Sequence, residues 1–252
     1  MDLWDRMTKR DQALPPRWLR FDSQSDFEEI GLHLKKLCTE YGGLTPGCSV
    51  LDIGCGVGRL AAPLTHFLDS NSRYEGFDVD KQAIAWCQRA IGSRHRNFNF
   101  RLTSVNNEHY NPDGEERGEN FQFPYEKNAF DFAVATSVFT HLSTEDAKQY
   151  LRELSRVLKP GASAVLTWYV LEDAQGTENQ GQDLSFDTPI DAFSATATPK
   201  NPLAAMAFRP DFILETIADV DLIPIADIYP GTWRVDEGPT HQDLLIVHKP
   251  TS

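Results

Sequence analysis

Short runs of β-branched and aromatic residues alternate with longer stretches of helical periodicity along most of this 252-residue sequence. Such alternation is typical of a parallel sheet with helices packed on both of its faces. A chain of this length with 40% hydrophobic residues can bury one substantial core. We therefore predict an α/β fold that forms a single domain over residues 1–252.

The predicted elements follow from hydrophobic period and from residues that start or stop helices. Asp80 is predicted to cap one helix, and Ser143 with Asp146 forms a variant capping box before another. Pro63 lies early in the second predicted helix, where we expect a kink. The predicted strands are 49–53, 73–79, 98–105, 130–138, 162–170, 223–229 and 241–248, and the predicted helices are 25–41, 56–68, 80–92, 143–158 and 210–218.

Residues 171–208 are rich in small, polar and Pro residues and show no period. A loop this long inside a compact domain is usually functional, often a lid, or else disordered. We interpret it as a solvated cover. The alternative is that it contacts a cationic substrate, because up to Pro199 it carries acids and no Lys or Arg. Those acids are Glu172, Asp173, Glu178, Asp183, Asp187 and Asp191.

The charge balance argues against a nucleic-acid partner. The sequence has 24 Lys and Arg against 37 Asp and Glu, a formal net charge of −13, which repels DNA and RNA. Four cysteines without ligand spacing predict neither a disulfide framework nor a zinc site, which favours a reducing cytoplasm. No apolar stretch reaches the roughly 20 residues that a membrane span needs, so we expect no membrane partner.

A glycine-rich turn follows the first predicted strand and describes a ligand site. Asp52 precedes Gly54, Gly56 and Gly58, and glycines let the backbone turn sharply and approach a ligand closely. Asp78 comes twenty residues after Gly58, at the end of the second strand, where a carboxylate can accept hydrogen bonds from two ribose hydroxyls. Ligands of such sheets bind at the carboxyl ends of the strands.

The glycine spacing distinguishes between two kinds of nucleoside ligand. It is GxGxG here, whereas the dinucleotide fingerprint is GxGxxG. With Asp52 ahead of the first glycine, the turn suits a nucleoside that carries an amino-acid tail better than a pyrophosphate. A nicotinamide-dependent oxidoreductase is therefore a disfavoured alternative.

The segment Val50–Gly58 resembles the first motif of class I S-adenosylmethionine-dependent methyltransferases. Further segments agree in order along the chain, at 76–79, 104–105, 130–138 and 156–161. The resemblance covers residues 44–170, and 123–125 with 137–142 resemble bacterial members that act on small molecules or sugars. It implies a Rossmann-like, doubly wound, mostly parallel seven-stranded sheet with helices on both faces and an antiparallel final strand.

The same resemblance implies S-adenosyl-L-methionine as cofactor and assigns its contacts. Asp52 and the glycines would hold the methionine moiety, Asp78 the ribose, and Val79 would flank the adenine. Ser104 stands where the family usually has Asp. We expect its uncharged hydroxyl to accept the hydrogen bond from the adenine amino group less strongly. The implied cofactor-binding residues are Asp52, Gly54, Cys55, Gly56, Gly58, Asp78, Val79, Ser104, Val105 and Thr136. The implied subdivision is an N-terminal helical extension (1–43), a cofactor-binding core (44–170), a cover (171–208) and a C-terminal helix with closing strands (209–252).

His141 is the preferred candidate for a general base. It follows the fourth predicted strand at the edge of the predicted pocket, and an unperturbed pKa near 6.5 suits proton acceptance at neutral pH. The alternative is that it only bonds to the loop backbone. His109 and Tyr110 are weaker candidates, and the metal-binding carboxylates of related catechol-type enzymes are missing, so no metal is expected.

The leading hypothesis is methyl transfer to an oxygen of a small metabolite or sugar by in-line displacement. A small amine as acceptor is one alternative. A catalytically silent cofactor-binding partner subunit is another.

Overall fold

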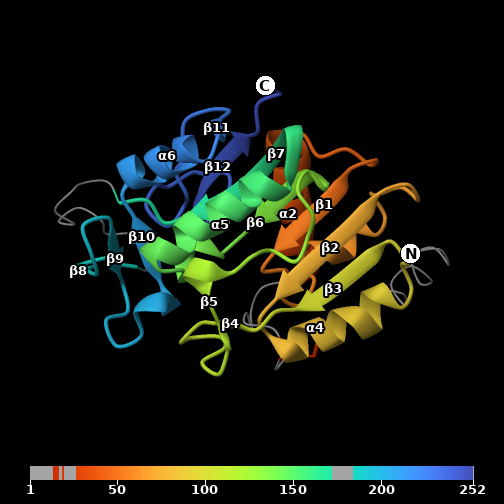
Figure 1. Ribbon diagram of the computed structural model, residues 1–252, viewed down its shortest axis with the longest axis horizontal. Helices are drawn as coiled ribbons and strands as arrows, with labels where there is room; N and C mark the ends of the chain where they lie inside the picture. Colours follow the sequence, from red (N-terminus) through yellow and green to blue (C-terminus); the bar gives the residue numbers. More distant parts are fainter. Residues whose placement is uncertain (1–13, 17–18, 20–26, 172–183, 252) are drawn as a thin grey trace.

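The computed structural model describes residues 14–16, 19, 27–171 and 184–251. Seven strands form its central sheet, and their order across it is β11-β12-β7-β6-β1-β2-β3 (Figure 1). They are β1 (Ser49–Ile53), β2 (Arg73–Asp78), β3 (Phe98–Leu102), β6 (Phe130–Ala135), β7 (Leu158–Trp168), β11 (Ile223–Pro224) and β12 (Asp243–His248).

The strand directions match the predicted topology. β1, β2, β3, β6 and β7 pair in parallel, whereas β12 is antiparallel to both β7 and β11. The chain starts at β1 in the middle, winds outward to β3, and then returns to β6 on the other side of β1. The predicted α/β, doubly wound and mostly parallel sheet with an antiparallel final strand is confirmed.

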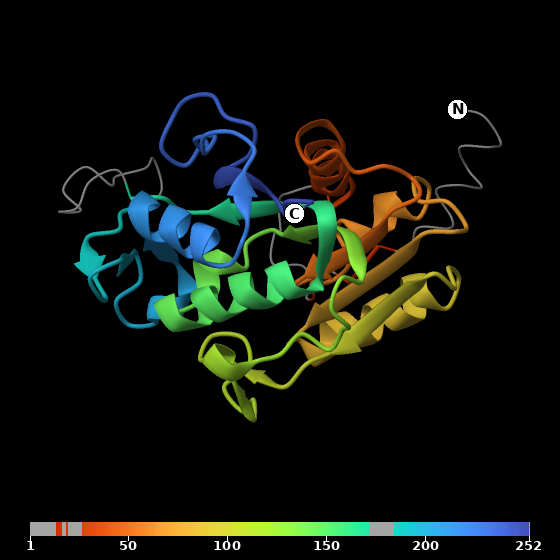
Figure 2. The same ribbon diagram turned by 45° about the horizontal axis from the view of Figure 1, so that its top comes forward.

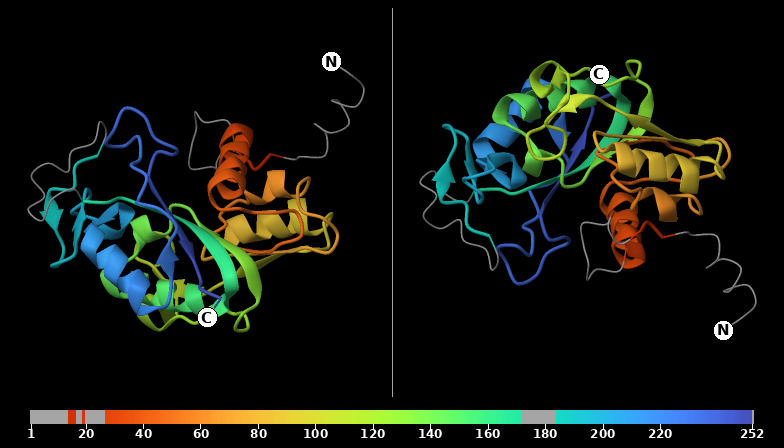
Figure 3. Two further views of the ribbon diagram at one scale, coloured as in Figure 1. Left: turned by 90° about the horizontal axis from the view of Figure 1, so that it is seen from above. Right: turned by 90° about the horizontal axis from the view of Figure 1, so that it is seen from below.

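Helices cover both faces of this sheet. α5 and α6 lie on one face, and α2 lies on the opposite one with α3 and α4 (Figure 3). Ser143 caps α5 by accepting from the Asp146 amide, and Asp80 caps α4 by accepting from two amides, as predicted. The helices are α2 (Phe27–Lys36), α3 (Ala61–Leu64), α4 (Lys81–Cys87), α5 (Thr144–Val157) and α6 (Pro210–Asp219).

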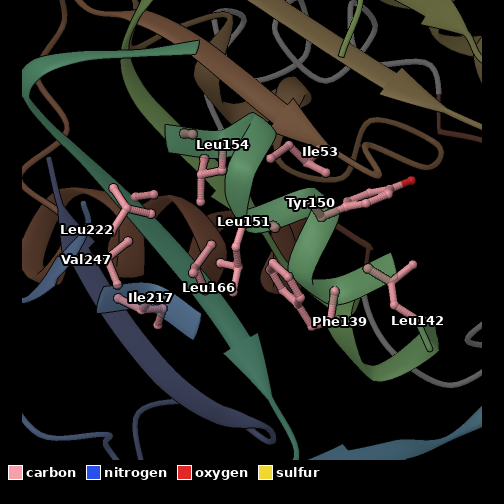
Figure 4. Close-up of a cluster of buried hydrophobic side chains, with 14 of the residues drawn as sticks. Ile53, Phe139, Leu142, Tyr150, Leu151, Leu154, Leu166, Ile217, Leu222 and Val247 are labelled. Atoms are coloured by element: carbon pink, nitrogen blue, oxygen red, sulfur yellow. The ribbon is translucent and has the colours of Figure 1, made fainter. Parts of the chain in front are cut away.

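Each face of the sheet has its own hydrophobic core, because the parallel strands are apolar on both sides. On one face, Leu151 and Leu154 of α5 pack against Leu166 of β7 and Ile217 of α6 (Figure 4). These side chains are fully buried. The packing fixes the carboxyl ends of β1, β2 and β6, where the site lies.

The predicted helix over 56–68 is wrong in its length, since only Ala61–Leu64 is α-helical. Gly58 has a left-handed φ of 75°, which delays the helix start. Pro63 has no amide hydrogen to donate, and turns continue to Leu68 through single hydrogen bonds. The α-helix therefore ends just after Pro63, where only a kink was predicted.

Several strand ends also differ from prediction, most of all in β11, which covers only Ile223–Pro224 of the predicted 223–229. β6 stops at Ala135 because Ser137 adopts a left-handed φ of 56°. β3 stops at Leu102, and Val105 pairs with Glu116 in a separate two-stranded sheet. β7 begins at Leu158, so Pro160 lies within a strand and not in a turn.

The predicted loop over 171–208 is also wrong for its described part. Residues 184–208 contain a three-stranded antiparallel sheet at one end of the molecule (Figure 2). Its strands are β8 (Thr188–Pro189), β9 (Ser194–Thr196) and β10 (Met206–Phe208). A small core beneath it includes Phe186 and Trp233, which explains why this stretch is ordered. Residues 172–183, with four of the six acids, lie outside the described residues.

Within the described ranges, no helix combines the length and apolar character needed to cross a membrane.

Candidate active site

A cavity of about 370 Å³ opens at the carboxyl ends of β1, β2 and β6. It lies where the winding of the sheet reverses, the usual ligand position in open α/β sheets. All predicted cofactor-binding residues except Gly58 and Ser104 line it, together with the base candidates His141 and Tyr110, whereas His109 does not. The cofactor-binding residues in the lining are Asp52, Gly54, Cys55, Gly56, Asp78, Val79, Val105 and Thr136.

The glycine turn shapes one wall of the cavity. Gly54 and Gly56 have φ values of 68° and 51°, which side chains rarely adopt. A Cβ on Gly54 would lie 2.6 Å from Val138 Cγ2, so this glycine permits close packing. A Cβ on Gly56 would meet nothing within 4 Å, so its bare backbone faces open space. The turn therefore leaves room for a ligand at Gly56.

Gly58 serves packing and does not line the cavity. Its φ is 75°, and an added Cβ would lie 2.8 Å from Ile91 Cδ1 and 3.0 Å from Cys87 Sγ. The predicted ligand contact at Gly58 therefore finds no support in the cavity lining. The residue lets the turn approach the helical segment that follows β2.

Asp78 presents a carboxylate to the cavity in a fixed orientation. One oxygen accepts from the Gly56 amide at 2.7 Å, and the other accepts from the Asp80 amide at 2.8 Å. Each carboxylate oxygen has a second acceptor site, so two positions remain for a ligand. Burial raises the pKa of Asp78 above its ordinary value, against the lowering effect of those two amides.

Asp52 is buried behind the glycine turn, with 3% of its surface exposed. The Tyr74 hydroxyl donates a hydrogen bond to its carboxylate. Burial raises the pKa of Asp52 to about 7, the Tyr74 hydrogen bond lowers it, and the charge of Asp78 raises it. Asp52 therefore changes protonation near neutral pH.

Ser104 does not line the cavity. Its hydroxyl accepts a hydrogen bond from the Glu115 amide at 3.2 Å. Asn106, Gly118 and Asp146 line the cavity near Val105 instead. Gly118 and Asp146 could not be predicted from the motifs because they lie far from Val105 along the chain.

His141 lies in a 3₁₀ turn that follows β6, with its ring at the cavity. Its Nδ1 is 3.0 Å from the Leu203 carbonyl oxygen, and its Nε2 is 3.3 Å from the Tyr110 hydroxyl. A carbonyl only accepts, so Nδ1 carries the proton and the neutral ring keeps an acceptor at Nε2. Burial lowers the pKa of His141, the Leu203 carbonyl raises it, and nearby His109 lowers it. His141 thus bonds to the loop backbone, the alternative raised above, and also keeps a basic nitrogen.

Asn107 ties the Tyr110 loop to the His141 turn, a role that the sequence did not reveal. Its side-chain amide donates to the His141 carbonyl at 2.9 Å. Its side-chain oxygen accepts from the amides of His109 and Tyr110, each at 3.0 Å. An Asn in a turn-rich polar stretch was the only signal.

Ser137 is a second residue that sequence reasoning missed. It lines the cavity in a left-handed conformation, and its hydroxyl donates to Gln242 Oε1 at 3.2 Å. Thr167 donates to the same oxygen at 2.6 Å and accepts from the Ser137 amide at 2.8 Å. Strained non-glycine backbone of this kind persists where surrounding contacts hold it.

Four aromatic side chains that could suit an apolar acceptor pocket lie in or against the hydrophobic cores. Phe139 and Trp168 are fully buried and stack with ring centroids 4.0 Å apart. Trp233 is buried beneath the small sheet, and Tyr125 packs against Phe130. None of them lines the cavity. In the part of the chain that the structure describes, no group of three or more His, Cys, Asp or Glu residues could hold a metal ion.

Comparison with known proteins relates part of the chain to a known domain. Residues 51–166 match the family model described as "Methyltransferase domain". The 2-phytyl-1,4-naphtoquinone methyltransferase of Synechococcus elongatus is 30% identical over 148 residues, which are 58% of this chain and 57% of that protein. The ubiquinone/menaquinone biosynthesis C-methyltransferase UbiE of Shewanella oneidensis is 25% identical over 58% of this chain and 53% of its own length. The chain thus spans little more than half the length of these relatives.

Solved structures share the fold at low identity. A protein from Pyrococcus horikoshii, PH0226, superposes with a TM-score of 0.60 at 16% identity and covers 99% of both chains. A SAM-dependent methyltransferase from Methanosarcina mazei gives 0.57 at 19% identity, over 85% of this chain and 98% of that one. The [4+2]-cyclase SpnF gives 0.60 at 17% identity, over 92% and 85%. These likenesses show the fold and not the reaction.

S-adenosylmethionine is the cofactor of this family, and the described cavity fits it. The open space at Gly56 and the two remaining acceptor positions of Asp78 match a nucleoside with an amino-acid tail. Residues 51–166 match a methyltransferase domain model, in agreement with the family that the sequence motifs resemble.

Proposed function

We propose that this chain transfers a methyl group from S-adenosylmethionine to an oxygen of a small metabolite or sugar. The observation that carries the proposal is that one cavity contains both the Gly56–Asp78 cradle and the neutral ring of His141. A cofactor cradle alone would suit the silent partner subunit equally well. A basic nitrogen beside it suits an enzyme.

Within this proposal, Asp78 binds the ribose hydroxyls and Gly56 lies against the cofactor. Asp52 helps to hold the methionine moiety, and Val79 packs beside the adenine. The residues that we propose for cofactor binding are Asp52, Gly54, Cys55, Gly56, Asp78, Val79, Val105 and Thr136, which line the cavity, with Gly58 shaping the turn. Ser104 stays a prediction, although its hydroxyl is engaged by Glu115.

When bound, the cofactor supplies a methyl group on a positively charged sulfur. The chain must hold the acceptor oxygen in line with that bond and exclude water, an orientation effect that can supply about 7 to 11 kcal/mol. On transfer to a hydroxyl, the carbon–sulfur bond would break as the methyl–oxygen bond forms, and His141 Nε2 would accept the hydroxyl proton. A positioned base of this kind contributes about 10²- to 10⁴-fold.

A carbon acceptor is the second candidate, because the relative from Shewanella oneidensis is named a C-methyltransferase. A carbon nucleophile also loses a proton, so His141 would serve the same purpose there. The two candidates differ in where the methyl group ends, which mass spectrometry and NMR of the product distinguish. The partner is in either case a small-molecule acceptor.

The experiment is a screen for S-adenosylhomocysteine release with sugars, phenols and quinones as acceptors, followed by His141→Ala. We expect that variant to lose at least about 100-fold in turnover, with an unchanged dissociation constant for S-adenosylmethionine. The matched control is His33→Ala, since His33 is exposed on α2. An unimpaired His141→Ala enzyme would remove the base from the proposal, and no release with any acceptor would favour the silent subunit.

A further inference from the structure

A closed ring of hydrogen bonds surrounds the His141 turn and involves the small sheet. Leu203 accepts from His141, and Asn201 bonds to His109 Nδ1 at 2.8 Å. Asn107 completes the ring by joining His109 to the His141 carbonyl. The hairpin between β9 and β10 therefore contacts the imidazole at Nδ1.

Leu203 lies in a 3₁₀ turn of three residues, Pro202–Ala204. A turn this short has little stability of its own, so its position depends on its neighbours. Thr196 of β9 supplies the contact. Its hydroxyl lies 2.9 Å from the Pro202 carbonyl oxygen and 2.8 Å from the Ala205 carbonyl oxygen, on either side of Leu203.

Thr196 is fully buried, and its hydroxyl also accepts from the Thr198 amide at 3.0 Å. The strand that carries it pairs with β10 through Met206 and packs on the small core beneath the sheet. The hydroxyl therefore links a rigid strand to the turn that presents the Leu203 carbonyl.

We propose that Thr196 is a positioning residue, which holds the Leu203 carbonyl so that His141 keeps its proton on Nδ1 and its lone pair on Nε2. The inference rests on the proposed function, in which Nε2 is the base. It gives the described part of 171–208 a defined task, which is to orient the base and not only to cover the site.

The titratable groups around the His141 ring are His109 and Tyr110, whose rings lie 6.0 Å and 5.0 Å away by centroid. Asp78 acts across the cavity on Tyr110, and this charge and burial together raise the pKa of Tyr110 to about 12. Both neighbours remain in a Thr196 variant. The Leu203 carbonyl favours the charged ring, so its displacement lowers the pKa of His141 further.

The test follows the His141 ring by ¹⁵N NMR of histidine-labelled full-length protein, with His141→Gln to assign the signal. In the wild-type chain, we expect an Nδ1-protonated ring that titrates below its ordinary pKa. In Thr196→Val, we expect a mixture of tautomers and a midpoint that falls by about 0.5 to 1 pH unit. Thr196→Ser retains the hydroxyl and should match wild type. Thr216→Val, a buried threonine on α6, is the control for a lost buried hydroxyl.

Wild-type tautomer and midpoint in Thr196→Val would overturn the proposal, as would an equal change in Thr196→Ser. If the valine variant does not fold, Thr196→Ala carries the same expectation without a methyl group against the two carbonyls. No acceptor is needed for this measurement. A negative result here therefore does not contradict methyl transfer. Full activity of His141→Ala would refute the role of His141 as base, but it would not contradict the positioning of the wild-type ring by Thr196.

Discussion

The Tyr74 hydroxyl donates a hydrogen bond to the buried carboxylate of Asp52, across the β1–β2 pair and directly behind the glycine turn. Both side chains are almost fully buried. The glycine turn therefore packs against a buried polar pair. The protonation state of Asp52 affects both the stability of the fold and the charge near the cavity.

Tyr74→Phe keeps the ring, which stacks on Phe98, and removes the donor. We expect the free energy of unfolding to fall by about 1 to 3 kcal/mol, because a buried acceptor loses its partner. The loss should be larger at pH 8 than at pH 5, since the carboxyl of Asp52, with a pKa of about 7, is charged only at the higher pH. Urea unfolding at both pH values measures it.

The sign of this pH dependence follows from linkage. The folded pKa of Asp52 lies above its ordinary value near 4, so its contribution to stability is greatest below pH 4 and is lost as the pH rises through about 7. Asp52→Asn removes this titration and serves as the control. An equal loss in Tyr74→Phe at pH 5 and pH 8 would contradict the assignment.

Gly56→Ala and Gly58→Ala should fail in different ways. Both force a side chain into a left-handed conformation, which costs about 1 to 2 kcal/mol. At Gly56 the new methyl group enters open space at the cavity, so weaker S-adenosylmethionine binding should dominate. At Gly58 it meets Ile91 and Cys87, so the loss of stability should be the larger of the two. Calorimetric titration and urea unfolding separate the effects, and the same pattern in both variants would contradict the assignment.

The rate of methyl transfer should fall as the pH is lowered, with a midpoint below pH 6.5. His141 must be neutral to accept a proton, and burial lowers its pKa. The rate is therefore retained at mildly acidic pH and is lost as the pH falls through the lowered pKa. Turnover at saturating cofactor across pH 5 to 8 checks this expectation, and an acid limb above pH 6.5 would speak against His141 as the base.

Asp243→Asn should destabilise the fold strongly. The carboxylate is fully buried at the start of β12 and accepts from Val170, Gly231, Trp233 and Arg234 at 2.7 to 2.9 Å. Removal of its charge breaks the ion pair with Arg234, and loss of one partner of a buried pair costs about 3 to 5 kcal/mol. Asp211→Asn breaks an ion pair with Arg209 whose side chains are 49% and 30% exposed, so it should change little in the same urea titration. Equal effects would contradict the distinction.

Local patterns in the sequence determined most of the fold and half of the site. The run from Val50 to Gly58, the carboxylate of Asp78 and the cap at Ser143 are signals that depend on neighbouring residues, and each lies where it was predicted. The order of strands followed from the alternation of β and helical periods. Such features are fixed by backbone sterics and by burial of one face, which a single sequence displays.

Only the tertiary structure decided which distant groups meet. Leu203 reaches His141, Gln242 reaches Ser137, and Asp146 enters the cavity while Ser104 turns to Glu115. No period or motif encodes such pairs, because they form when strands from separate parts of the chain pack at one edge of the sheet. The ordered sheet in 184–208 arises in the same way, since its small core includes Trp233 from a later segment.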